Sequence, residues 1–81
     1  MTPEDEARFA RLELVWRALS PTGASIVCAV YATDGAGVEV RVVHEDRSVV
    51  NVQRAVDLRR ARQLAESWRL VAIEAGYISL P

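Results

Sequence analysis

The chain has 81 residues, a formal net charge of -1, and 51% hydrophobic and 26% charged residues. This composition excludes a disordered chain, and the length suits one small α+β domain spanning residues 1–81. The near-neutral charge gives no reason to expect nonspecific binding of nucleic acid or membrane by the whole surface. No apolar run approaches a membrane span and the start of the chain is acidic, so we expect a cytoplasmic protein that is not inserted in a membrane.

One cysteine and one histidine limit the ways in which so small a domain can gain stability. They exclude an intramolecular disulfide and a zinc-finger ligand set, and we expect neither a metal nor a cofactor. Self-association is then the leading remedy, which predicts a homo-oligomer, in the simplest case a dimer. All ten basic residues are arginines. This bias suits recognition of carboxylate or phosphate, but a GC-rich coding sequence would also produce it.

The first segment, residues 2–19, has the pattern of a helix with well-formed ends. Thr2 can serve as the N-cap, and Pro3 suits the first helical position. Ser20 to Gly23 then form a turn signal that ends the segment. The apolar residues recur at three- and four-residue spacing, which favours a helix; they are Phe9, Leu12, Trp16 and Leu19.

Three short segments rich in β-branched residues follow, at 25–33, 38–44 and 48–53. Turn signals at 34–37 and 45–47 join them, with no room for a crossover helix, so we expect an antiparallel meander. Alternation places Val27, Ala29, Tyr31, Arg41 and Val43 on one face, with Tyr31 and Arg41 as cross-strand neighbours. We expect the N-terminal helix or another subunit to cover that face.

The last large segment, residues 57–75, is predicted to be a helix with Asp57 as its N-cap and Gly76 as a left-handed C-cap, with a start one turn earlier at Arg54 as the alternative. The apolar tail, residues 77–81, is expected to dock on its own chain or on another subunit. The predicted fold class is therefore α+β in the order α-β-β-β-α. It is a two-layer structure in which a three-stranded antiparallel meander packs against the C-terminal helix.

Residues 25–77 resemble small uncharacterised bacterial proteins that consist of a β-meander followed by a helix. The resemblance lies in the hairpin, in the central Ala65-Glu66-Ser67-Trp68-Arg69 and in the terminal Ala75-Gly76-Tyr77. It implies the meander-plus-helix fold. It implies no activity, because those proteins have none established.

The only cysteine and the only histidine fall on neighbouring predicted strands. A three-residue loop at 35–37 would place Val30 opposite Val42 and Cys28 opposite His44, on the same face. Two interpretations follow: a reactive thiol with its base, or a buried cysteine that is chemically silent beside a histidine at a strand end. The apolar row that contains Cys28 favours the second interpretation. A metal site would need Glu45 or Asp46 as further ligands.

No established catalytic or phosphate-binding motif is present, and we predict that the protein is not an enzyme. Five arginines gather around the predicted C-terminal helix, and we interpret them as a surface for a macromolecular partner: Arg54, Arg59, Arg60, Arg62 and Arg69. Six apolar or aromatic residues lie outside the expected core, and we interpret them as a self-association surface: Leu14, Leu70, Ile73, Tyr77, Ile78 and Leu80.

The preferred functional hypothesis is a non-enzymatic, homodimeric protein that binds a macromolecular partner. The alternative is a small regulatory nucleic-acid-binding protein that uses the arginine-rich start of the C-terminal helix. An enzyme that uses Cys28 and His44 is the third hypothesis.

Overall fold

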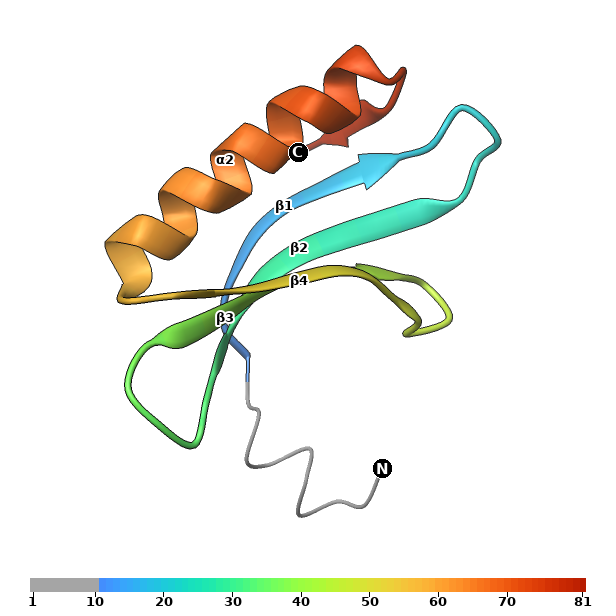
Figure 1. The fold of residues 1–81 in the computed structure, drawn as a ribbon. Helices are drawn as coiled ribbons and strands as arrows, with labels where there is room; N and C mark the ends of the chain where they lie inside the picture. Colours follow the sequence, from blue (N-terminus) through green and yellow to red (C-terminus); the bar gives the residue numbers. More distant parts are fainter. Residues whose placement is uncertain (1–10) are drawn as a thin grey trace.

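A computed structural model describes residues 11–81, which form one antiparallel sheet and one helix (Figure 1). The sheet has five strands in the order β4-β3-β2-β1-β5, and α2 lies across one of its faces. All four neighbouring strand pairs are antiparallel. The elements in chain order are β1 (Arg11–Leu19), β2 (Ser25–Ala32), β3 (Val38–His44), β4 (Val49–Ala55), α2 (Leu58–Glu74) and β5 (Ile78–Leu80).

The prediction of a helix over residues 2–19 is wrong for the part that the structure describes. Residues 11–19 form β1, which pairs with β2 on one side and with β5 on the other. The expected cap residues Thr2 and Pro3, and Phe9 of the expected apolar stripe, lie outside the described residues.

The apolar residues behind the helix prediction do not share a face of β1, which contains two β-bulges: Leu12 lies at a bulge, Trp16 points toward α2, and Leu19 lies on the other side of the sheet. The pairing with β2 advances by one extra residue at Leu12 and again at Val15. Each bulge lengthens the ordinary two-residue repeat of a strand. The β1 residues that point toward α2 are therefore Glu13, Trp16 and Ala18, at spacings of three and two. The bulges interrupt the two-residue alternation, so the sequence of β1 lacks the regular pattern that predicts a strand.

The expectation of a three-stranded sheet is also wrong, because β1 and β5 join β2, β3 and β4 in one five-stranded sheet. Besides β1, the tail contributes β5, in which Leu80 lies opposite Arg17 and Ile78 lies opposite Leu19. The tail thus docks on its own chain. A three-residue strand is too short for sequence alternation to reveal, and only the pairing with β1 defines it.

The predicted C-terminal helix is confirmed, together with both of its ends. The side chain of Asp57 accepts a hydrogen bond from the backbone N–H of Arg60 at 2.8 Å, as an N-cap should. At the other end Gly76 has φ +99°, a conformation that costs glycine little. Gly76 N–H donates to Ile73 O and Tyr77 N–H donates to Ala72 O, which together form a Schellman motif.

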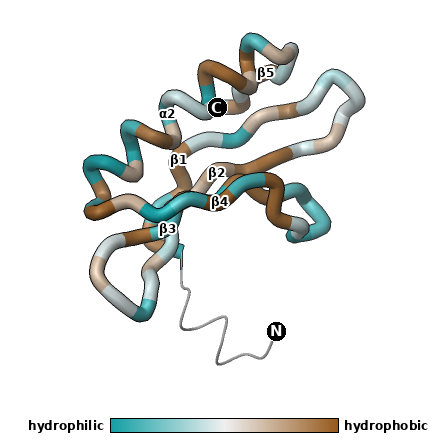
Figure 2. Tube along the Cα trace, viewed as in Figure 1, coloured by the Kyte–Doolittle hydropathy of each residue, from teal (hydrophilic) through white to brown (hydrophobic). Residues whose placement is uncertain are grey.

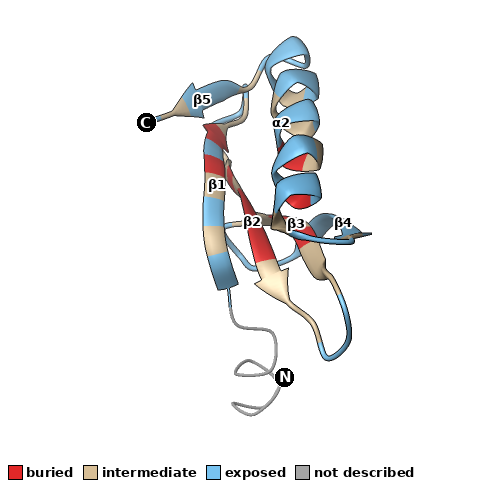
Figure 3. Ribbon diagram, turned by 90° about the vertical axis from the view of Figure 1, so that its left-hand side faces the viewer, coloured by how far each residue is buried: buried red, intermediate tan, exposed pale blue. Residues whose placement is uncertain are grey.

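The hydrophobic core lies between α2 and the sheet face beneath it. Figure 3 shows the buried residues on the strands under the helix and on the inner side of α2. Ala61 and Ala65 are fully buried, and their small side chains let the helix approach the sheet closely. Trp16 of β1 lies under the helix, and its indole N–H donates to the carbonyl oxygen of Ala65 at 2.7 Å.

We expect Trp16→Phe to destabilise the protein more than the matched change Trp68→Phe. Both substitutions shrink an indole in the same layer, but only Trp16 donates a buried hydrogen bond to the helix. Losing that bond should lower the free energy of unfolding by about 1–3 kcal/mol. Urea denaturation followed by circular dichroism measures the difference. Equal losses in the two variants would contradict the proposed role of the Trp16 bond.

Candidate functional site: the sheet face opposite the helix

The predicted pairing of Cys28 with His44 is not present in the structure. Cys28 lies opposite Val42, and His44 lies opposite Ile26, so the predicted register is wrong by two residues. The faces were predicted correctly, because a shift of two keeps every side chain on its side of the sheet. The loop between β2 and β3 is longer than expected, five residues rather than three, spanning residues 33–37.

Cys28 has the environment of a silent core thiol. Its side chain is fully buried on the α2 side of the sheet, and burial raises its pKa to about 12. A nucleophilic thiol needs a lowered pKa and access to solvent, and Cys28 has neither. Within residues 11–81, no group of three or more histidine, cysteine, aspartate or glutamate side chains is arranged to hold a metal ion.

We expect the Cys28 thiol to react with a thiol reagent only when the protein unfolds. Its raised pKa also predicts a pH dependence. In the unfolded chain the thiol ionises above its ordinary pKa of 9.0, whereas in the folded protein it stays protonated to about pH 12. Relative to Cys28→Ala, the native protein should therefore lose about 1.4 kcal/mol of stability per pH unit above pH 9. Rapid labelling of the native protein at pH 8, or a difference that does not change with pH, would contradict this.

The sheet face opposite α2 is covered by no other element of residues 11–81 (Figures 1 and 3). Side chains directly opposite each other in antiparallel strands share a face, so the pairing defines which residues lie there. We call this surface the open face. Three rows cross it: Arg11–Tyr31–Glu39–Arg54, Leu14–Ala29–Arg41–Val52 and Leu80–Arg17–Val27–Val43–Val49.

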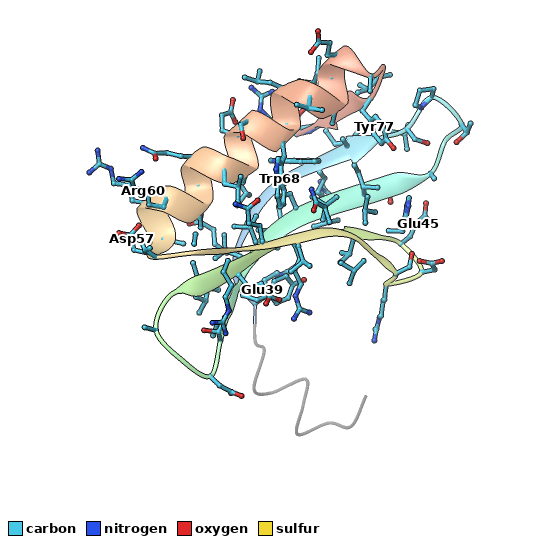
Figure 4. The ribbon with its side chains drawn as sticks, in the orientation of Figure 1. Glu39, Glu45, Asp57, Arg60, Trp68 and Tyr77 are labelled. Carbon is cyan, nitrogen blue, oxygen red and sulfur yellow. The ribbon has the colours of Figure 1, made fainter. Side chains whose placement is uncertain are left out.

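The open face is positively charged. Four of its residues in these rows are arginines and one, Glu39, is acidic. Glu39 accepts a hydrogen bond from Arg41 Nε at 2.5 Å and lies on the side of the sheet away from α2 (Figure 4). The same Arg41 guanidinium lies 4.9 Å from the centre of the Tyr31 ring, within cation–π distance. Arg17 donates to the carbonyl oxygen of Pro81 at 2.8 Å.

Apolar side chains lie between the arginines of the open face. Val52 is 49% exposed and Leu14 is 42% exposed, although both belong to the sheet. Val27 and Val43 are half-buried in the neighbouring row. The open face therefore combines arginine guanidinium groups with partly exposed apolar surface.

The five arginines predicted to form a partner surface do not lie on one surface. Arg62 binds Glu13 of β1 at 2.6 Å, and Arg69 binds Glu66 at 2.6 Å. These hydrogen bonds lower the pKa values of the Glu13 and Glu66 carboxyl groups. Arg54 belongs to the open face. Arg59 and Arg60 remain at the exposed start of α2, from which Arg60 extends outward (Figure 4).

A shallow surface hollow of about 500 Å³ lies where the start of α2 meets the end of β4. Arg54 and Arg60 contribute to its lining, and they are the two residues of the predicted arginine surface that do so. The remaining lining residues are Ala36, Gln53, Ala55, Val56 and Leu64.

The sequence did not single out Arg11 and Arg17 as site residues, because a helical interpretation of β1 scatters them around a helix axis. The alternation in β3 did place Arg41 on the same face as Tyr31, and this is confirmed. The two residues are diagonal rather than direct neighbours, because Ala29 lies opposite Arg41.

The predicted self-association residues fall on different parts of the molecule. Leu14, Ile78 and Leu80 share the side of the open face, by their pairing with neighbouring strands. Leu70 and Ile73, 55% and 41% exposed, belong to the helix on the opposite side of the sheet. Tyr77 is half-buried and packs against the core. A single flat interface cannot contain all six residues.

Comparisons with known proteins identify no relative: no family model, no curated protein and no solved structure matches the chain. The resemblance to bacterial meander-plus-helix proteins therefore stays a prediction. Within the part of the chain that the structure describes, no helix has the length and apolar character needed to cross a membrane.

Proposed function

We propose that the chain is a non-enzymatic binding protein whose open face docks on an acidic surface of a partner protein. The observation that carries this proposal is the charge of that face, where four arginines stand against Glu39 alone. Arginine pairs with carboxylates through two parallel hydrogen bonds, which gives both affinity and orientation.

The apolar rows of the open face support a protein partner. Val43 and Val52 offer surface that a partner can remove from water, and Arg41 is next to both of them, opposite Val52 and two residues from Val43 along β3. Arginine side chains beside apolar surface are common in protein–protein interfaces. A face that bound only phosphates would gain little from valines.

The alternative is a nucleic-acid-binding protein, and one observation favours it. Arg54 and Arg60 both line the hollow at the start of α2, where the helix dipole favours anions. Against it, bases are held largely by stacking on aromatic rings. Tyr31 is the only aromatic residue in the three rows of the open face, and the Arg41 guanidinium already lies against its ring.

Two double variants with the same change in net charge separate the two hypotheses. Arg11→Glu/Arg17→Glu alters the open face, and Arg59→Glu/Arg60→Glu alters the start of α2. The second variant is a suitable control because acidic residues are favourable at a helix N-terminus, so the helix should persist. We expect a partner protein captured by the native chain to be retained by the α2 variant. The open-face variant should bind the purified partner at least about tenfold more weakly.

Fluorescence anisotropy with a labelled single-stranded oligonucleotide provides the opposing measurement. Tight, steeply salt-dependent binding that only the α2 variant loses would establish the nucleic-acid hypothesis and overturn the proposed function. Loss of the purified partner from the α2 variant rather than from the open-face variant would also overturn it.

A further inference from the structure

Strand β4 is at the edge of the sheet and leaves backbone hydrogen-bonding groups unpaired on its outer side. In the described residues its only strand neighbour is β3. The hairpin pairs His44 N–H with Ser48 O, and the bulge at Val50 shifts the alternation by one residue, so that Asn51, Gln53 and Ala55 face β3. Val52 is one of the residues that face outward, since its backbone N–H donates to the side-chain oxygen of Asn51 at 3.0 Å rather than to β3. By the same alternation Arg54 faces outward too.

The edge has only one of the features with which edge strands usually resist pairing, the bulge at Val50. Natural edges carry β-bulges, proline, lysine or inward-pointing charges, or are very short. β4 has seven residues, no proline and a single charged residue, Arg54. Val49, Val50 and Val52 are 52%, 52% and 49% exposed. Figure 2 shows hydrophobic and hydrophilic stretches in succession along this strand. From Asn51 onward the edge is regular, and a regular edge of this kind is a template for another strand.

We propose that a second copy of this chain pairs with that edge, β4 against β4, about a two-fold axis through Val52. An antiparallel pairing with this symmetry sets Val52 opposite Val52 of the partner copy, Asn51 opposite Gln53, and Val50 opposite Arg54. The outward-facing backbone groups of Val52 then bond each other reciprocally. The Val52 N–H exchanges its local bond to Asn51 for a bond to the partner's carbonyl oxygen.

Side-chain chemistry selects this register over its neighbours. On the open face the two Val52 side chains meet, and on the α2 face the amide of Asn51 meets that of Gln53. The two Arg54 side chains are then four residues apart along the strands, about 13 Å. An axis through Gln53 would bring them to diagonal positions about 7–8 Å apart, where like charges repel. An axis through Asn51 would place the bulged Val50 beside the centre of the ladder.

This arrangement extends the sheet across both copies and keeps like faces on the same side, because residues directly opposite share a face. The two α2 helices then lie on one side, and the two open faces form one continuous surface on the other. The interface differs from the one predicted at Leu14, Leu70, Ile73 and the tail. It uses backbone groups of β4 and does not depend on the binding of any partner to the open face.

Val52→Pro tests the proposal by removing one backbone N–H group from the edge of β4. The substitution removes the outward N–H but no hydrogen bond to β3, so the edge position should tolerate it. Sedimentation equilibrium should show a dimer for the native chain and for the control Val52→Thr, which keeps the N–H and the β-branched shape. It should show a monomer for Val52→Pro. A native chain that is monomeric at about 100 μM, or a Val52→Pro variant that remains a dimer, would overturn the proposal.

Hydrogen exchange of the native chain decides the question even if Val52→Pro does not fold. The amides of Val52 and Arg54 should exchange at least about tenfold more slowly at high than at low protein concentration. The amide of Gln53 points toward β3 and should be protected from exchange at both protein concentrations. A native dimer in which exchange at Val52 does not depend on concentration would mean that another surface joins the copies. The Arg11→Glu/Arg17→Glu variant, altered in β1, should still dimerise, which separates this proposal from the proposed function.

Discussion

The hydrogen bond from the Trp16 indole to the Ala65 carbonyl joins the first described strand to the middle of the helix. It requires Trp16 to point toward α2 and requires the helix to lie close enough for a 2.7 Å contact. Fully buried alanines at 61 and 65 permit that approach. Once Trp16 is directed toward the helix, the bulged alternation of β1 sends Arg11, Leu14 and Arg17 to the other side of the sheet. The chemistry of the open face is thus a consequence of how the core is packed.

A single helix cannot cover a five-stranded sheet on both faces. The buried residues gather on the α2 side, with Ala29 of the open face as the exception. Ala29 is small and lies among larger neighbours, which include Tyr31 and Arg41. The rest of the open face and the outer edge of β4 are covered by no other element of the described chain. One has guanidinium groups beside valines, and the other has unpaired backbone groups.

The sequence predicts the elements whose signals are local. The ends of α2 follow from Asp57 and Gly76, because capping depends on residues within one turn. The faces of β2 and β3 follow from simple alternation, which brings Arg41 and Tyr31 to one side. The register of β2 and β3 does not follow from the sequence, because the loop between them is longer than the glycines suggest. In this loop the Thr33 hydroxyl lies within hydrogen-bond distance of the carbonyl oxygens of Gly35 and Gly37.

The elements that depend on distant partners were not predictable. The strand alternation of β1 is interrupted by two bulges, which are defined only by pairing with β2. β5 exists only through its pairing with β1. The arginines of α2 are close together in the sequence, but a helix has 3.6 residues per turn, so their side chains point in different directions. Arg62 then meets Glu13, which the helical interpretation of β1 could not bring near.

The exposure of valine methyl groups to a soluble paramagnetic probe most directly tests the claim that one sheet face is packed and the other is open. Val40 and Val30 are fully buried on the α2 side, whereas Val43 and Val52 lie on the open face. With methyl-labelled protein we expect strong relaxation enhancement at Val43 and Val52 and little at Val30 and Val40. Equal protection of all four would show that the open face is covered in solution and would contradict the proposed binding surface.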